Sequence, residues 1–177
     1  MVQVKGVRIS VRRVRAAMLA SLFSIGVAVS GAVYAATSST TFTVNATVQS
    51  NCTISATNVD FGIYDPNAGS PSDTSSTLSV LCTNGTPYTV ALDAGSNAGS
   101  TVANRHMVSE NGDQLTYDLY TDASHTSLWG DGNSGTDTVS ASGSGGSQAI
   151  TVYAEIPNGQ TVPAGSYSDS VTATLNY

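Results

Sequence analysis

The chain has 177 residues, with six Lys or Arg against twelve Asp or Glu and a formal net charge of −6. Five of the basic residues lie within the first fifteen positions, so the rest of the chain carries Arg105 alone against twelve acids, a formal charge of 1 − 12 = −11. A surface this poor in cations repels phosphates, which excludes nucleic acid and anionic membrane surfaces as partners.

Residues 1–35 predict an export signal. A basic stretch up to Arg15 precedes an uncharged apolar run from Ala16 to Val33, and the small-residue pattern Val33-Tyr34-Ala35-Ala36 follows. This order is typical of a secretory signal peptide, cleaved after Ala35. A membrane anchor is the alternative, because the run is just long enough to span a bilayer. The Ala/Ser/Gly-rich end favours cleavage and no stable membrane insertion.

The 177 − 35 = 142 residues that follow predict one all-β domain. Apolar and polar residues alternate with period 2, first over 41–48, where Phe42, Val44, Ala46 and Val48 share one face. Further strands are expected over 52–54, 59–64, 77–82, 88–93, 114–121, 128–129, 148–156 and 166–177. An Asn84-Gly85 turn separates two of them. Seven or eight short strands between turn sequences indicate a β-sandwich.

The two cysteines, Cys52 and Cys82, both lie in the exported part of the chain. A single disulfide in an oxidising compartment is the simplest interpretation, closing a loop of about 30 residues worth roughly 3–4 kcal/mol. Free or catalytic thiols are the alternative. The chain has no Cys-x-x-Cys spacing and no nearby basic residue to lower a thiol pKa, which favours the disulfide.

Motifs for catalysis, metals or cofactors are weak. His106 and His125 lie in no metal-ligand spacing and are expected on the surface or in loops, and no Gly-x-Ser-x-Gly motif occurs. Residues 131–137 begin like a calcium loop, but Ser142 stands where the closing Glu would be, which favours a solvated acidic loop. We therefore expect no enzyme activity, no metal site and no cofactor.

Several blocks of sequence, taken in order, resemble the spore coat protein U domain family, the subunit domain of archaic chaperone–usher pili. The blocks are Asn51-Cys52-Thr53-Ile54 through Val59-Asp60-Phe61-Gly62-Ile63-Tyr64, 78–88, 115–122 with Leu128-Trp129-Gly130-Asp131-Gly132, 152–157 and 162–169. Each block alone is a weak signal, but together they cover nearly all of the exported chain.

This resemblance implies an incomplete immunoglobulin-like β-sandwich that is completed by a donor strand from a neighbouring subunit. Residues 36–48 would be the donor segment, with Phe42, Val44, Ala46 and Val48 as its apolar side chains, and 49–177 the sandwich domain. It also places the disulfide on Cys52 and Cys82. From the pattern alone, 42–48 could equally be the first strand of a self-complete sandwich.

The implied partners are identical or related pilin subunits, a periplasmic chaperone and an outer-membrane usher. The chaperone would engage the C-terminal strand, whose inward positions are Val171, Ala173, Leu175 and Tyr177. The expected function is a structural subunit of a surface fibre for attachment and biofilm formation, exported through the periplasm to the cell surface or secreted. A secreted spore-coat or matrix protein is one alternative. A tip adhesin that binds a surface or glycan is another, although such subunits usually carry an additional domain.

Overall fold

The computed structural model describes residues 35–177, so the predicted export signal lies almost wholly outside the described residues. Residues 45–177 form one compact unit, and the residues before them belong to a second unit, treated separately below. Within the described part of the chain no helix is long and apolar enough to cross a membrane.

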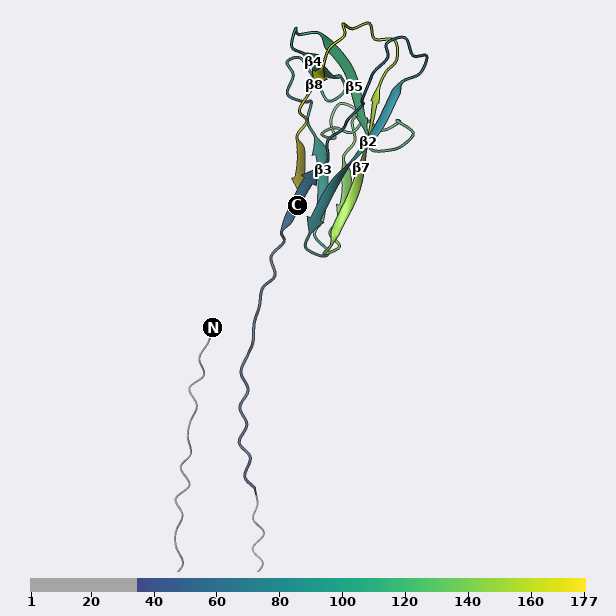
Figure 1. The fold of residues 1–177 in the computed structure, drawn as a ribbon. Coiled ribbons are helices and arrows are strands. Elements are labelled where there is room, and N and C mark those ends of the chain that lie inside the picture. The colour runs from purple at the N-terminus through teal and green to yellow at the C-terminus, as the bar shows by residue number, and fades with distance from the viewer. Residues whose placement is uncertain (1–34) are drawn as a thin grey trace, which may run out of the picture. The chain divides into compact units, whose positions relative to one another are not determined.

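The compact unit is built from nine β-strands (Figure 1). They are β1 (Cys52–Ala56), β2 (Ser72–Cys82), β3 (Pro87–Leu92), β4 (Arg105–Ser109), β5 (Gln114–Tyr120), β6 (Val139–Ser142), β7 (Ser147–Ile156), β8 (Tyr167–Ser168) and β9 (Ala173–Asn176). Six form one sheet in the order β1-β2-β7-β5-β4-β8, and three form a second in the order β6-β3-β9. Every strand pair is antiparallel, and the all-β prediction is confirmed.

The core lies where alternate side chains of both sheets point inward. Each central strand places every second residue in the core, as the period-2 pattern predicts. These buried residues are Leu78, Val80 and Cys82 of β2, Tyr88, Val90 and Leu92 of β3, Leu115, Tyr117 and Leu119 of β5, and Val152, Ala154 and Ile156 of β7. Trp129, fully buried, joins them, and its indole N–H donates to the carbonyl of Val90 at 3.1 Å.

A disulfide joins Cys52 to Cys82. The two residues face each other as register partners at one end of the β1–β2 ladder. The bond therefore ties the edge strand β1 to the rest of its sheet, in addition to constraining the unfolded chain.

The predicted strand over 59–64 is wrong: these residues pair with no strand. The backbone turns where the Gly62 N–H donates to the Asp60 carboxylate at 2.8 Å, and Gly62 has a φ of +65°, outside the extended region. Val59, Phe61 and Tyr64 nevertheless pack against the core. The apolar pattern at 59–64 therefore indicates burial against the core and not pairing with a neighbouring strand.

Other strand predictions need smaller corrections. The strands flanking Asn84-Gly85 do not pair as a hairpin, because β2 and β3 belong to different sheets. The predicted strand 166–177 is divided into β8, which pairs with β4, and β9, which pairs with β3. Residues 128–129 form only isolated bridges. The sequence analysis missed β4 and β6 entirely.

The histidine prediction holds for His125, which lies in the loop after β5, but is wrong for His106. His106 is on β4 and 4% exposed. Its ring nitrogens lie 3.2 Å from the Ser100 hydroxyl and 3.2 Å from the Ala98 carbonyl. These partners satisfy both nitrogens, so a polar ring can be buried at this position.

The one cation of the described chain is a core residue. Arg105 on β4 is fully buried, and burial lowers the pKa of its guanidinium. Its guanidinium donates to the carbonyl of Asp93 through two nitrogens, at 2.9 and 2.7 Å, and to the carbonyls of Trp129 and Val102 at 2.9 and 3.1 Å. The planar guanidinium thus donates hydrogen bonds to three loop carbonyls that accept none from a neighbouring strand.

Replacing Arg105 by Lys should lower the free energy of unfolding by about 2–4 kcal/mol, because a single ammonium cannot reach all three carbonyls. Urea unfolding followed by Trp129 fluorescence would measure the loss. Glu110→Gln, a change at an exposed turn after β4, is the control and should leave stability unchanged. An Arg105→Lys protein as stable as wild type would contradict a structural role for the guanidinium fork.

Candidate subunit interface

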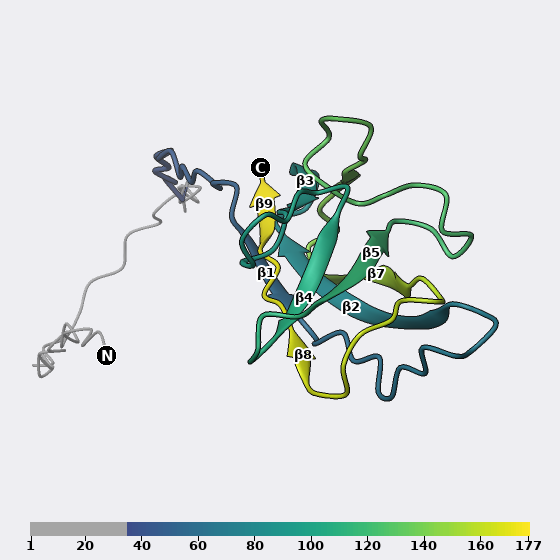
Figure 2. The same cartoon turned by 90° about the horizontal axis from the view of Figure 1, so that it is seen from above.

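Two stretches of backbone face each other without a strand between them. β1 is one edge of the six-stranded sheet, and residues 57–66 continue from it as a stretch without strand pairing. β8 is the other edge of that sheet, and β9 is the edge of the three-stranded sheet. Within the described residues β1 and β9 approach each other but form no ladder (Figure 2). Both stretches therefore keep hydrogen-bonding groups free on one side.

We call the strip of partly covered apolar side chains along residues 52–64 and 162–177 the groove. Twelve partly buried apolar side chains pack against the core, and nine of them belong to these two stretches. The nine are Ile54, Val59, Phe61, Tyr64, Val162, Tyr167, Val171, Ala173 and Leu175. The partly buried apolar side chains are thus concentrated along these two stretches.

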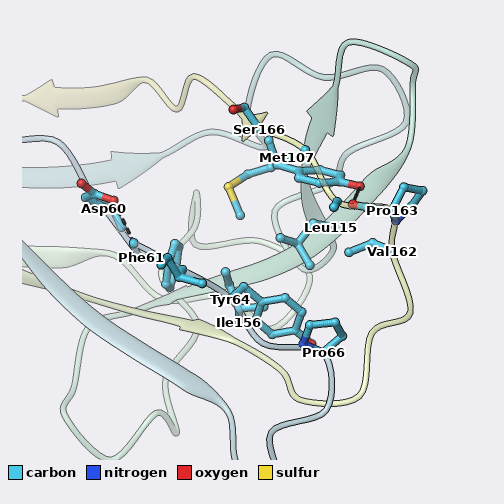
Figure 3. Close-up of a pocket in the computed structure, with 16 residues that line it drawn as sticks. Asp60, Phe61, Tyr64, Pro66, Met107, Leu115, Ile156, Val162, Pro163 and Ser166 are labelled. Carbon is cyan, nitrogen blue, oxygen red and sulfur yellow. Dashed lines mark hydrogen bonds between the residues drawn. The ribbon is translucent and has the colours of Figure 1, made fainter.

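At one end the groove deepens into a cavity of about 560 Å³ (Figure 3). Residues 59–66 and 162–167 form its two sides, and Met107, Leu115 and Ile156 of the six-stranded sheet contribute to its lining. The Tyr64 hydroxyl donates to the carbonyl of Pro157 at 3.0 Å, which fixes one wall against the loop after β7. The cavity can accept an apolar side chain of considerable size.

The C-terminal side of the groove shows the alternation expected of a strand with one face covered. Val171, Ala173 and Leu175 are partly buried, whereas Thr172, Thr174 and Asn176 are exposed. Tyr177 continues the inward series in sequence but is 62% exposed. Three of the four residues predicted to face the chaperone thus share the partly buried side of this stretch, and the ring of Tyr177 is uncovered at its end.

Two carboxylates hold the C-terminal stretch in place. Asp93 accepts the N–H of Thr172 at 2.8 Å and that of Gly95 at 2.9 Å. Asp169 accepts the Tyr117 hydroxyl at 2.7 Å. Burial, together with that hydrogen bond, raises the pKa of Tyr117, so the phenol remains a donor at neutral pH. The position of β9 therefore depends on contacts made before the strand begins.

The N-terminal segment 35–51 has no strand partner in the structure. Phe42, Val44 and Val48 are 84%, 81% and 82% exposed, and Ala46 is exposed as well. Because apolar side chains are exposed at every second position, this segment is a candidate for interaction with another chain.

In the calcium-like loop, residues 131–137, the carboxylate of Asp131 accepts hydrogen bonds from the loop itself. Asp131 accepts the backbone N–H of Asn133 at 2.9 Å and its side-chain amide at 3.0 Å, and the Thr136 hydroxyl lies 3.4 Å away. These contacts lower the pKa of Asp131, chiefly through the Asn133 side chain. The loop is a hydrogen-bonded turn.

Comparisons with known proteins agree on the type of domain. The model of the family described as Spore Coat Protein U domain matches residues 38–174. "Protein U" of Myxococcus xanthus is 36% identical over 129 residues, covering 67% of this chain and 71% of that protein.

Among solved structures, a chaperone–tip adhesion subunit pre-assembly complex, CsuC–CsuE, from archaic chaperone–usher Csu pili of Acinetobacter baumannii, matches with a TM-score of 0.56 and 26% identity. The match covers 74% of this chain but only 41% of the matched one. A chaperone–tip adhesin complex of CFA/I fimbriae also matches, at 14% identity, a TM-score of 0.48 and 71% of this chain against 41% of that one.

Acid should loosen the attachment of the C-terminal stretch. Burial raises the pKa of Asp93, but its hydrogen bonds from Thr172 and Gly95 outweigh burial and the net pKa is lowered. A lowered pKa stabilises the fold above the unfolded-state value near 4 and ceases to do so as the pH falls through the folded-state value.

The free energy of unfolding should therefore fall between pH 6 and pH 3 by more in wild type than in Asp93→Asn, as measured by urea titration at each pH. Equal pH dependence in wild type and Asp93→Asn would contradict this role of the carboxylate.

Proposed function

Because this chain belongs to the spore coat protein U domain family, we propose that it is a structural subunit of a surface fibre, polymerised by donor-strand exchange. In this scheme residues 36–48 of one subunit enter the groove of the next. The observation that carries the proposal is the run of half-buried side chains along both sides of the groove, within a domain whose core is otherwise closed.

The donor segment matches the groove in its period. Phe42, Val44, Ala46 and Val48 recur at every second residue, and so do Val171, Ala173 and Leu175 along one side of the groove. A strand laid along the edge would place alternate side chains over the core and pair its backbone with the free groups of β9. The cavity lined by Phe61 and Tyr64 offers room for the largest donor side chain.

The energetics favour a long-lived contact. Burying each of the three large donor side chains, Phe42, Val44 and Val48, is worth roughly 1.5–3 kcal/mol. New ladder hydrogen bonds add to this. Since the donor segment and the groove are different surfaces of the chain, the contact is heterologous and extends into a filament.

A chaperone and an usher would assist this polymerisation. An open groove is an aggregation hazard, and a periplasmic chaperone would cover it until the next subunit arrives. The C-terminal stretch with Tyr177 is the proposed contact, because it forms one side of the groove and leaves an aromatic ring exposed. The likeness to a solved complex of a chaperone with a pilus subunit supports this partner, and export to the cell surface follows from it.

The position in the fibre follows from the N-terminal segment. The solved complex contains a tip subunit, and this chain covers 41% of the matched chain of that complex. A terminal subunit needs no donor segment for a neighbour beyond it. An exposed donor-like segment in this chain favours the shaft.

Attachment and biofilm formation are the roles we assign to the fibre. The likeness to Protein U supports a coat or matrix role as the second candidate, and the same polymerisation would serve it. A structural family supports no catalysis.

Placing a charge on the donor face should stop polymerisation. Phe42→Arg or Val44→Arg forces a guanidinium into an apolar groove, and the dissociation constant between subunits should rise at least about a hundredfold. The measurement is the fraction of heat-resistant multimers on a gel and by size-exclusion chromatography. Deleting residues 36–48 should have the same effect.

The matched control is Thr43→Arg, which adds the same charge to the opposite face of the segment and should leave multimers intact. Leu175→Arg should block the accepting groove instead, so that it fails to assemble even with wild-type donors. Normal multimers from Phe42→Arg, or equal loss in Thr43→Arg, would overturn the donor assignment.

A further inference from the structure

Three carboxylates form a row on the outer face of the six-stranded sheet. Asp73 of β2 is the register partner of Glu155 of β7, and Glu155 is also opposite Asp118 of β5. Register partners project to the same face, and like charges placed directly opposite each other destabilise a sheet. An offsetting positive charge is therefore expected beside this row.

No Lys or Arg side chain among residues 35–177 forms an ion pair with this row. Arg105 is the only one among residues 35–177, and its guanidinium is buried on three backbone carbonyls. In the described residues the ion pairs that involve this row both come from His125. His125 Nδ1 lies 3.1 Å from Glu155 Oε2 and 3.9 Å from Asp73 Oδ1.

The histidine ring is held in this position. Tyr120 stacks on it with ring centroids 4.8 Å apart and an interplanar angle of 30°. The loop is pinned by Asp122, which accepts the N–H of Ser127 at 2.8 Å and that of Thr126 at 3.1 Å. The His125 side chain is 18% exposed and Glu155 20%, whereas Asp73 is 58% exposed and leaves the site open to solvent.

The spacing suits a small divalent ion. One ligand atom from each of Asp73, His125 and Glu155 lies within 4.8 Å of the other two. Tetrahedral zinc with bonds of 2.0–2.2 Å places its ligand atoms about 3.3–3.6 Å apart. The two distances from His125 bracket that range, and the exposed Asp73 side chain is free to adjust.

We propose that Asp73, His125 and Glu155 bind a zinc-class divalent transition-metal ion on the outer face of the sheet. One imidazole and two carboxylates are a donor set for zinc, and the nitrogen ligand disfavours calcium and magnesium. Water would complete the coordination from the exposed side. The ion would clip the loop after β5 to strands β2 and β7. This site lies outside the groove, so the proposal does not depend on donor-strand exchange.

The test is calorimetric titration of ZnCl₂ into protein purified in its exported form and freed of metal with a chelator. We expect one Zn²⁺ per chain, with affinity at least about tenfold weaker in His125→Gln and in Asp73→Asn. Co²⁺ should give the visible absorption bands of a tetrahedral site with a nitrogen ligand in wild type and lose them in His125→Gln. Thermal unfolding should shift upward with Zn²⁺ in wild type and not in His125→Gln.

Asp131→Asn is the matched control, since it removes one exposed carboxylate elsewhere and should bind Zn²⁺ as wild type does. Asp73 is exposed, so its replacement tests the site without disturbing the core. Absence of stoichiometric Zn²⁺ binding, binding unchanged in both His125→Gln and Asp73→Asn, or an equal loss in Asp131→Asn would overturn the proposal.

Discussion

The constraint on which the rest of this structure depends is the satisfaction of backbone hydrogen bonds at two facing edges. Buried strands satisfy their N–H and C=O groups with neighbours on both sides, but β1 and β9 each have one described neighbour. The side chains along these edges are consequently only half-buried, although they are apolar and pack against the core. In the proposed assembly, a donor strand would supply both the missing ladder and the missing apolar cover.

The molecule stabilises the edges of this gap with contacts that need no strand. The disulfide ties β1 to β2, Asp93 and Asp169 hold the stretch before β9, and Tyr64 is bonded to the loop after β7. The Arg105 guanidinium joins three loop carbonyls at the centre. Such contacts fix the walls of the groove, as the proposed entry of a donor strand would require.

The charged side chains are divided between the interior and the surface. The chain after residue 35 places its single cation inside and its carboxylates outside, so surface repulsion between copies opposes nonspecific association. In the proposed fibre, specific contact would depend on apolar complementarity at the groove. Where carboxylates are forced together, as at Asp73 and Glu155, the fold brings His125 to them from a distant loop.

Sequence alone determined the all-β class, the alternating core of β2, β5 and β7, and the family, because a period of two and ordered motif blocks are local properties of the chain. It could not show that 59–64 packs without a ladder, that the last strand changes sheets, or that Arg105 and His106 are buried, because polar residues are accepted in a core only when distant partners satisfy them. The tertiary structure also decided which half-buried side chains line one groove and which three residues, far apart in sequence, meet on the outer face. Pairing between strands is a long-range relation, and no local pattern encodes it.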